Sequence, residues 1–578
     1  MIQKEELISK IMEMADLSND EKAEIIGSLR KAKKYGLVWE DHPEDAEERL
    51  KSAFPVLREV KELAINSSPR GGQEGAVPNH ILIEGDNLEA LMALSYTHEG
   101  KVDVIYIDPP YNTGNKDFIY NDCIVDSEDG YRHSKWLSFM EKRLRLAKKL
   151  LSDKGVIFIS IDDNEQANLK LLCDEVFESS NHLATFIWKK RQMVDSRTKN
   201  GASKDHDYLI CYRRTEDARI KGKLADMSKY SNPDNDPRGP WMSADMTGLA
   251  TPEQRPNLHY DLTNPITGVV YKCPPTGWRY ERSRMASLVE NGEVLWPPKP
   301  EGRPRRKKFV KDLTSDTTGL STVLETVFST QGTREVRDIF EGKEVFDFPK
   351  PVDLLKLILD QSLNRSSLVL DFFAGSGTTL HATMQLNAED GGHRQCILVT
   401  NNENNICRDV TYERNKRVIQ GYTTPKGVAV EGLNANKLRY YTIDFLPREY
   451  TNEAKRELMR AATDMLCIKE GIYNEVREFC GMKFKPSILR YFRQDTSTGS
   501  AQVHQMLLIF DERVIEHIVP MMATIEGKLK IYVFSNGAYA YEDEFQELRD
   551  KVELCALPEA LLQVYKQVLP QNDDEVRI

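Results

Sequence analysis

The sequence predicts an α/β protein whose core is a parallel, doubly wound sheet. Short apolar runs of strand length alternate with segments of helical periodicity, as they do in βαβ units. This rhythm is broken once, in a middle region, and resumes afterwards. With 578 residues, the chain has room for three or four domains at roughly 100–200 residues each.

The N-terminal region, residues 1–60, is expected to be helical. Its apolar residues recur among charges at the period of an amphipathic helix. The residues that set this period are Ile8, Ile11, Met12, Ile25, Ile26 and Leu29. The following stretch, 66–79, is rich in Ser, Pro, Gly and Asn and has the composition of a linker.

The predicted core begins after this linker. Strands are expected at 80–86, 102–107 and 155–161, with helices after the first of them and at 137–151. The segments LATFIWKK and YLICYRR follow as strands. Much later, 366–375 and 396–400 are strands that flank a helix.

Residues 215–345 interrupt the alternation, because they are rich in Pro, Gly, Trp and Arg and contain only short strand-like pieces. We interpret them as an inserted domain. From about residue 424 the alternation resumes weakly, with a helix predicted at 446–466. The predicted segments are 1–60 (helical), 61–214 and 346–423 (two parts of the core), 215–345 (insertion) and 424–578 (a C-terminal α/β domain for oligomerisation or partner contact).

The composition is that of a globular protein without a membrane span. The net charge is −11 and the pI about 5.7, so a nucleic-acid binder of this kind must gather its Lys and Arg on one face. The nine cysteines form no CxxC pair, and the N-terminus lacks the apolar run of a signal peptide. We expect a cytoplasmic protein that needs no metal.

The first chemical motif is Asp108-Pro109-Pro110-Tyr111, directly after a predicted buried strand. Ligands of open α/β sheets bind outside the carboxyl ends of strands. An aromatic amine is a poor nucleophile, and the Asp108 carboxylate and the Pro109 carbonyl could accept hydrogen bonds from it and localise its lone pair. Tyr111 offers a face on which an extruded base could stack. The alternative is a surface turn, since Asp-Pro-Pro is good turn chemistry.

The second motif runs from Asp371 to Thr379 (DFFAGSGTT), again between a strand and a helix. Its glycines allow a ligand to approach the backbone, and the helix start presents free N–H groups. A dinucleotide-binding loop would need a third glycine where Leu380 stands, so a smaller adenosine cofactor fits better. Glu403, after the next strand, could hold ribose hydroxyls or could be a solvated loop acid.

Here the sequence resembles the β-class amino methyltransferases, in which the DPPY motif precedes the cofactor loop. It is most similar to the modification (Mod) subunits of Type III restriction–modification systems. The resemblance covers about residues 35–445. It is carried by LIEGDNLEAL (82–91), YIDPPYNTG (106–114), FDFPKP (346–351), LDFFAGSGTT (370–379) and LVTNNENN (398–405).

The resemblance implies an adenine-N6 methyltransferase that uses S-adenosylmethionine, with a Rossmann-like core. DPPY rather than SPPY points to adenine N6 over cytosine N4. The catalytic residues would be Asp108, Pro109, Pro110 and Tyr111. The cofactor-binding residues would be Asp86, Lys350, Asp371, Phe372, Phe373, Ala374, Gly375, Gly377, Thr378 and Glu403.

Within this set, Phe372 or Phe373 would lie against the adenine ring, and Lys350 near the methionine portion. Asp86 would contact the adenine or the methionine end of the cofactor. Two alternatives stay open: Asp86 could be a helix N-cap and Lys350 a surface lysine in a turn.

A duplex hides the amino group of adenine, so the base must be flipped out and the sequence read by another part of the chain. In the family this is the inserted region. Its basic run can neutralise phosphates or read guanine edges, although such a run is commonly a solvated loop. The candidate DNA-binding residues are Lys189 and Arg191, and in the insertion Arg303, Arg305, Arg306, Lys307 and Lys308.

The expected partners are double-stranded DNA, a second copy of the chain in a homodimer, and a restriction or helicase subunit. The chain has no GxxxxGK[ST] loop, so translocation and cutting would come from a partner chain. Two other functions stay open: methylation of an amine in RNA or protein, and a recognition subunit that mainly guides a helicase–nuclease.

Overall fold

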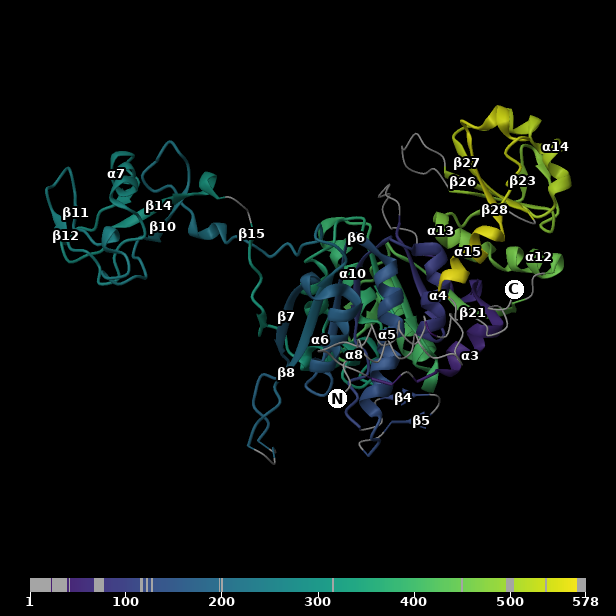
Figure 1. The fold of residues 1–578 in the computed structure, drawn as a ribbon, viewed down its shortest axis with the longest axis horizontal. Helices are drawn as coiled ribbons and strands as arrows, with labels where there is room; N and C mark the ends of the chain where they lie inside the picture. Colours follow the sequence, from purple (N-terminus) through teal and green to yellow (C-terminus); the bar gives the residue numbers. More distant parts are fainter. Residues whose placement is uncertain are drawn as a thin grey trace. The chain divides into compact units, whose positions relative to one another are not determined.

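The computed structural model describes most of the chain beyond the N-terminal region (Figure 1). The described residues are 22, 39–40, 42–66, 77–114, 118–120, 123–125, 128–196, 198, 201–313, 317–448, 451–494, 504–535 and 538–568. They divide into two compact units, Met1–Ile220 with Ser321–Ile578, and Lys221–Leu320.

The first unit is built on a mixed sheet that contains ten strands within the described residues. In sheet order they are β1 (Ala53–Glu59), β21 (Lys437–Pro447), β2 (Asn79–Glu84), β18 (Gln395–Thr400), β17 (Leu368–Asp371), β3 (Val102–Ile107), β6 (Leu151–Ile161), β8 (His206–Arg213), β7 (His182–Lys189) and β16 (Val323–Leu324). The run from β21 to β6 is parallel throughout, and β8 is antiparallel to both of its neighbours.

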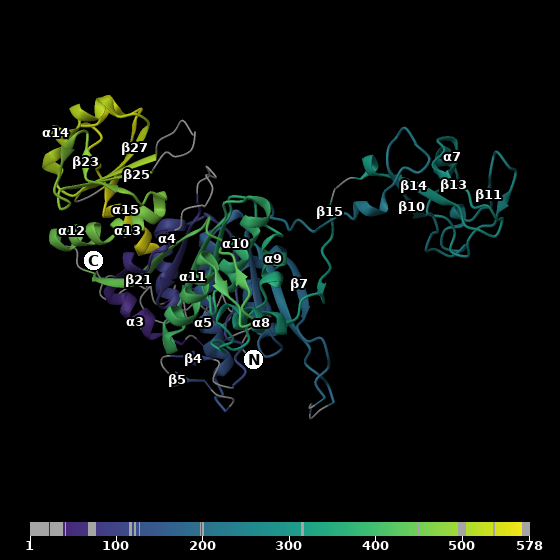
Figure 2. The ribbon, with the colours of Figure 1, turned by 180° about the vertical axis from the view of Figure 1, so that it is seen from behind.

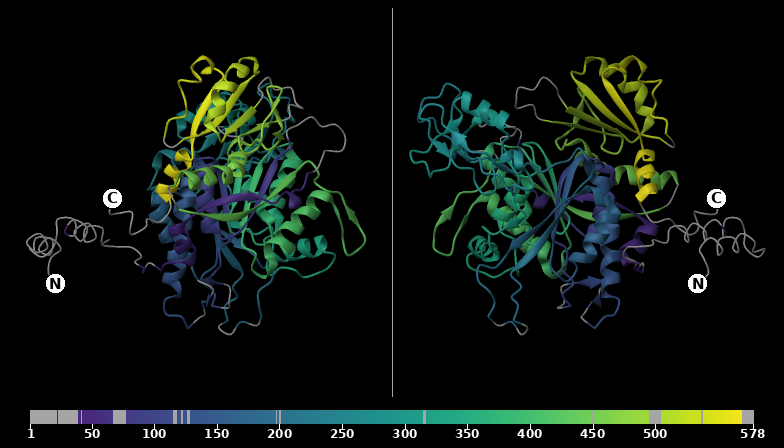
Figure 3. Two further views of the ribbon diagram at one scale, coloured as in Figure 1. Left: turned by 90° about the vertical axis from the view of Figure 1, so that its right-hand side faces the viewer. Right: turned by 60° about the vertical axis from the view of Figure 1, so that its left-hand side comes forward.

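Helices cover both faces of this sheet. In the two views of Figure 3, the blue helices of the first half and the green helices of the second half lie on opposite sides of it. The first set is α4 (Asn87–His98), α5 (Arg132–Leu150) and α6 (Gln166–Cys173); the second is α8 (Ser329–Ile339), α9 (Val352–Leu359), α10 (Thr378–Asp390) and α11 (Glu413–Gln420). The predicted α/β class is confirmed. The central strands are apolar over their length because both of their faces are buried.

The N-terminal prediction is partly wrong. Residues 45–52 form helix α3 (Asp45–Ser52), but residues 53–59 form the edge strand β1, which pairs antiparallel with β21. Pro55 removes the backbone donor that a helix would need there, whereas an edge strand tolerates it. The apolar positions between 8 and 29 that suggested helices lie outside the described residues.

The C-terminal region also differs in detail. The helix expected at 446–466 is two helices, α12 (Asn452–Ala461) and α13 (Thr463–Glu470). They begin later than expected, because Leu446 and Pro447 still belong to β21. Beyond them lies a five-stranded sheet with the order β22-β25-β26-β27-β28, shown in yellow-green and yellow in Figure 2. Its strands are β22 (Glu475–Val476), β25 (Leu489–Arg493), β26 (His504–Ile509), β27 (Lys528–Phe534) and β28 (Val552–Leu557).

The second unit is narrower than the insertion expected at 215–345, since residues 321–345 belong to the first unit. It holds a small sheet of β10 (Trp241–Asp245), β14 (Arg305–Phe309) and β13 (Val294–Leu295), with helix α7 (Arg282–Glu290). Trp278, Met285 and Leu288 lie in its own hydrophobic core. Across the described residues of both units, no helix is long and apolar enough to cross a membrane.

Candidate active site

Four adjacent parallel strands bring the predicted site residues to one edge of the main sheet. In sheet order these are β2, β18, β17 and β3. Asp86 follows β2, Glu403 follows β18, Asp371 ends β17 and Asp108 follows β3. The DPPY motif and the glycine loop, which are far apart in sequence, are therefore neighbours in space.

Asp108 is held from one side only. Its Oδ2 atom pairs with the ammonium group of Lys350, whereas its Oδ1 atom is buried and accepts no hydrogen bond within the part of the chain that the structure describes. The carbonyl of Pro110 accepts a hydrogen bond of 2.7 Å from the indole of Trp136. Since the scaffold engages Pro110, the acceptors left for a ligand are Asp108 and the carbonyl of Pro109.

The exit of the DPPY turn is fixed by a buried carboxylate that sequence reasoning missed. Asn112 has a left-handed backbone (φ 55°), which asparagine tolerates better than most residues. Its amide donates a hydrogen bond of 2.5 Å to Glu165, which is fully buried and also lies 2.6 Å from the imidazole of His133. Asn112 is adjacent to a Thr-Gly pair, a local turn signal, but nothing near Glu165 in the sequence indicates its role.

Lys350 covers the ring of Tyr111 as well as the carboxylate of Asp108. Its Nζ lies 5.2 Å from the ring centroid, which is cation–π distance. The hydroxyl of Tyr111 is buried without a hydrogen-bond partner, and burial together with Asp108 raises the pKa of this phenol well above its ordinary value. The Lys350 side chain is 12% exposed, so it is a buried ion-pair partner and not the surface lysine of the alternative interpretation.

Asp371 closes β17 and shapes the loop after it. Its carboxylate accepts hydrogen bonds from the backbone N–H of Phe373 (3.0 Å) and the hydroxyl of Thr379 (2.5 Å). The pKa of Asp371 is raised to about 7, first by burial and also by the neighbouring Asp108, while these hydrogen bonds and Lys350 oppose the shift. Asp371 thus fixes the conformation of the loop through hydrogen bonds to two of its residues.

The two central glycines of the loop are sterically required. Gly377 has φ +75°, and a Cβ there would collide with the amide of Asn415. Gly375 has φ +48°, and a Cβ would come within 3.2 Å of the ring of Phe346. Both conformations favour glycine, so these two residues fix the path of the loop backbone.

This loop borders a cavity of about 80 Å³. It is lined by Tyr106, Asp108, Phe346, Phe348, Lys350, Leu355, Asp371, Phe373, Ala374, Gly375, Ser376, Thr378 and Thr379. Of the two phenylalanines predicted to face adenine, Phe373 lines the cavity, whereas Phe372 is buried in the hydrophobic core. Ligand pockets are typically about 300–1,000 Å³, so the present space admits only part of a nucleoside cofactor.

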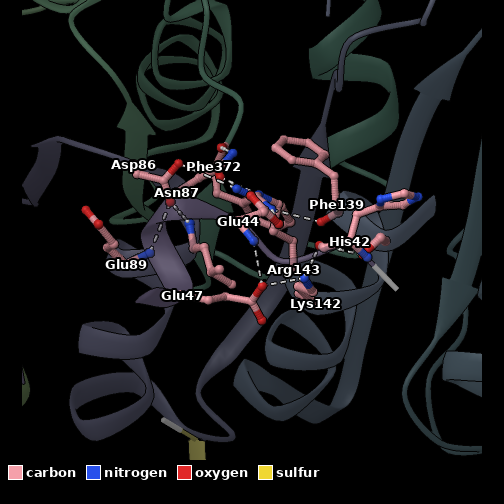
Figure 4. Close-up of polar contacts among 12 residues, drawn as sticks. His42, Glu44, Glu47, Asp86, Asn87, Glu89, Phe139, Lys142, Arg143 and Phe372 are labelled. Atoms are coloured by element: carbon pink, nitrogen blue, oxygen red, sulfur yellow. Dashed lines mark hydrogen bonds and ion pairs between the residues drawn. The ribbon is translucent and has the colours of Figure 1, made fainter. Parts of the chain in front are cut away.

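The start of α4 is tied to the cofactor loop by a buried polar network (Figure 4). Asp86 is the N-cap and accepts a hydrogen bond of 2.8 Å from the backbone of α4, as its alternative interpretation expected. The next residue, Asn87, donates to the carbonyl of Phe372 (3.0 Å) and accepts from the buried Arg143 (2.5 Å), which also pairs with Glu44 at 2.8 Å. Asp86 remains about a third exposed, so its contact with a cofactor stays a prediction.

Glu403 is exposed at the start of a short 3-10 helix, Glu403–Asn405, after β18. Lys189 and Arg191 are also exposed, and Arg191 pairs with Asp195 at 2.7 Å. The residue between them, Lys190, was not predicted. It pairs at 2.6 Å with the buried Asp207. Burial raises the pKa of Asp207, Asp108 raises it as well, and Lys190 and Lys350 lower it.

The basic run of the second unit is only partly available to a ligand. Arg303, Arg305 and Lys308 are exposed. Arg306 pairs with Glu293 at 3.1 Å, and Lys307, which is 8% exposed, pairs with Asp234 and with Asp236 at 3.0 Å. These two cations stabilise the unit itself, and the DNA contact predicted for all five stays a prediction.

A family model described as DNA methylase matches residues 102–422, from the start of β3 to the end of the second core segment. The chain belongs to the DNA methylase family. Four of the five sequence segments that carried the resemblance lie partly or wholly within this match. The assignment of individual residues of this DNA methylase to roles stays a prediction.

The relatives of this DNA methylase include Mod subunits. It is 36% identical to the Type III restriction-modification enzyme StyLTI Mod subunit of Salmonella typhimurium, over 56% of this chain and 52% of the relative. It is 34% identical to the Type II methyltransferase M.KpnI of Klebsiella pneumoniae (59% and 84%) and 29% identical to the EcoP15I Mod subunit of Escherichia coli (63% and 64%). The match thus spans about half the length of the StyLTI subunit.

Among solved structures, PvuII DNA methyltransferase (cytosine-N4-specific) matches 59% of this chain and 89% of its own, with 13% identity and a TM-score of 0.32. The M1.HpyAVI–SAM complex matches 58% and 98%, with 14% identity and a TM-score of 0.28. At these TM-scores, neither structure adds to the argument.

Proposed function

We propose that this chain is a site-specific DNA methyltransferase that moves a methyl group from S-adenosylmethionine to N6 of an adenine flipped out of duplex DNA. The observation that carries the proposal is the meeting of Asp108 with the Gly375–Gly377 loop at the ends of two paired strands. Membership of the DNA methylase family supports the reaction class. The similarity to Mod subunits supports a role as the modification subunit of a Type III-like restriction–modification system.

The residues at the cavity fit this cofactor. Gly375, which has no side chain, lets a ligand approach the backbone of the loop, and Phe373 supplies an apolar wall. Lys350 supplies a cation for the carboxylate of the amino-acid end. When bound, the cofactor supplies an electrophilic methyl group on its sulfonium. Because the cavity is small, the side chains at its mouth, among them Phe348 (87% exposed), must move to admit the whole molecule.

The chain's own contribution is positioning and hydrogen-bond acceptance. The Asp108 carboxylate and the Pro109 carbonyl accept hydrogen bonds from the two N–H groups of N6, which localises the nitrogen lone pair for attack. Tyr111 stacks against the flipped base. Lys350 must leave the ring of Tyr111 and the Oδ2 atom of Asp108 before the base can occupy this position. Holding the reacting groups in line lowers the entropic cost of the transfer.

The second unit is the proposed reader of DNA sequence. Residues 221–320 carry 16 Lys and Arg against 12 Asp and Glu, within a chain whose net charge is −11. This local excess of cations, with Arg303, Arg305 and Lys308 exposed, suits a phosphate backbone. The proposed partners are duplex DNA in the cytoplasm, a second copy of the chain, and a restriction or helicase subunit.

The test is methylation-aware long-read sequencing of DNA from a methylation-deficient host that expresses the chain. The test variant is Asp108→Asn, which keeps the shape of the side chain and removes its charge. The matched control is Asp163→Asn. Asp163 follows the next strand, β6, and its carboxylate accepts a hydrogen bond from Tyr208. We expect N6-methyladenine at one short motif in the wild type and in Asp163→Asn, and none in Asp108→Asn. An unmodified genome, from protein that binds S-adenosylmethionine, would contradict the proposal and favour RNA, protein or partner-dependent substrates.

A further inference from the structure

The guanidinium of Arg414 is a buried cation without a carboxylate partner. Three arginines are among the largest fully buried side chains: Arg143, Arg394 and Arg414. Arg143 pairs with Glu44 at 2.8 Å, and Arg394 pairs with Asp390 at 2.7 Å. Arg414 makes no ion pair within 4.0 Å in the described part of the chain, and its Nε atom has no hydrogen-bond partner. Because burying an unpaired charge is costly, this arrangement calls for an explanation.

Arg414 lies on α11 and reaches the loop that begins α10. Its Nη1 atom donates to the hydroxyl oxygens of Ser376 (2.9 Å) and Thr378 (2.6 Å), and its Nη2 atom lies 3.5 Å from Nδ1 of His381. Burial lowers the pKa of His381 well below its ordinary value, so this imidazole is neutral. Nη1 also donates to the backbone carbonyl of Ser376 (3.4 Å), so the positive charge of Arg414 rests on four neutral groups.

Glu335 acts on Arg414 through space but makes no ion pair with it within 4.0 Å in the described residues. Burial raises the pKa of the Glu335 carboxyl, and its Oε2 atom accepts a hydrogen bond of 3.0 Å from the backbone of Val352. The guanidinium itself has its pKa lowered to about 10 by burial and stays protonated at neutral pH. Arg414 is thus a protonated, buried guanidinium without an ion pair within 4.0 Å in the described part of the chain.

The two hydroxyls that bind Arg414 also line the cavity. Since each hydroxyl oxygen accepts from the guanidinium, its hydrogen must point elsewhere. The Ser376 and Thr378 oxygens are 3.1 Å apart, so one hydroxyl can donate to the other and the remaining O–H is free to donate to a ligand. The first N–H groups of the 13-residue helix α10 lie at the same place and favour an anion.

We propose that Arg414 is a positioning residue that turns the hydroxyls of Ser376 and Thr378 into donors for the carboxylate at the amino-acid end of S-adenosylmethionine. This inference rests on the proposed function, because it names the part of the cofactor that the loop recognises. The bound carboxylate supplies the counter-charge that Arg414 lacks. No residue of the DPPY turn takes part, and Lys350, which pairs with Asp108, is the second cation proposed for the same carboxylate.

The test compares two ligands that differ only in the group at issue. S-adenosylhomocysteine carries the amino-acid end, whereas 5′-methylthioadenosine has the same thioether and nucleoside without it. Calorimetry measures the Kd of each for the wild type and for Arg414→Gln, Thr378→Val and Arg394→Gln. Arg394→Gln is the matched control, because it removes a buried arginine that pairs with the C-terminal end of α10 and not with the loop at its start.

We expect Arg414→Gln and Thr378→Val to weaken S-adenosylhomocysteine about tenfold or more, or about 1.4 kcal/mol, and to leave 5′-methylthioadenosine unchanged. Arg394→Gln should change neither. A parallel loss of both ligands in Thr378→Val, with an unchanged melting temperature, would overturn the inference and leave a structural role. Thr378→Val keeps the test decisive if Arg414→Gln does not fold. Wild-type protein that binds neither ligand would instead refute the proposed cofactor.

Discussion

The active-site edge of the first unit and the basic strand of the second unit use charge in opposite ways. At the edge, Arg414 is fully buried and Asp108 and Lys350 are partly buried, and Oδ1 of Asp108 and Nε of Arg414 have no hydrogen-bond partner in the described residues. On the strand, the buried Lys307 is paired with two carboxylates, whereas Arg305 and Lys308 are exposed. Desolvated charges act strongly over short distances, whereas exposed charges are screened by salt. The first arrangement suits chemistry on one ligand, and the second suits attraction to a polyanion.

The largest effect on cofactor affinity is expected from a substitution in the glycine loop. Gly377→Ala forces a left-handed residue and a Cβ into the amide of Asn415, so we expect S-adenosylmethionine binding to be lost, by about 100-fold or more in Kd. Gly391→Ala is the matched control, because Gly391 ends the same helix with φ +69° and has nothing within 4 Å of the added Cβ.

Calorimetry with S-adenosylhomocysteine measures both variants. Gly391→Ala should lower stability by about 1 kcal/mol through backbone strain alone and should bind as the wild type does. Equal losses of affinity in the two variants would show that helix stability, and not the close approach of the loop, sets the binding.

A moderate effect is expected on the strand of the second unit. Replacing Arg303, Arg305 and Lys308 together with Ala should weaken duplex binding and reduce the slope of log K against log salt by up to about 2.7, at about 0.9 for each phosphate contact. Fluorescence anisotropy at several salt concentrations measures this slope.

The buried neighbour of these cations should behave differently. Lys307→Met removes the ion pair of Asp234 and leaves Asp236 with Arg238 alone, so it should lower the thermal stability of the protein while leaving the salt slope of the folded fraction unchanged. If the salt slope in Lys307→Met fell by one third of the change in the triple variant, Lys307 would contact DNA as the exposed cations do. The proposed difference between buried and exposed cations would then be wrong.

The smallest effect is a pH dependence. Burial raises the pKa of Asp371 from 3.8 to about 7, so between these values the folded state binds more protons than the unfolded state does. Stability therefore falls as pH rises through this window. Asp371→Asn removes the group, so its melting temperature relative to the wild type should rise from pH 5 to pH 8 in ligand-free protein. A difference that stays constant with pH would show that Asp371 does not titrate in this range.

The sequence predicted the core well because local signals and tertiary contacts agree there. The strands before Asp86, Asp108 and Asp371 are apolar runs with a polar end, and the pairing of β17 with β3 made their motifs neighbours. Where tertiary contacts outweigh a local pattern the prediction was wrong, as in β1, whose residues had been assigned to a helix.

The residues missed at the site share one property: their partners are remote in sequence. Glu165 lies 53 positions from Asn112, and Arg414 lies 36 positions from Thr378. A charged residue such as Arg414 carries no local sign that it will be buried. Which cations of the basic run are buried could not be predicted from the sequence either. Lys307 is buried because its strand pairs antiparallel with β10 and because carboxylates lie nearby.

The strand order also constrains how the protein can be made. β2 and β3 follow one another in the chain but are not paired, because β18 and β17 lie between them. Those two strands are synthesised only after residues 221–320. During translation, β2 therefore lacks both of its partners, β18 and β21, and β3 lacks β17, until the second part of the core has been made. A ribosome-bound chain that ends before β17 should be recognised by chaperones that bind exposed strands, and released once β21 has emerged.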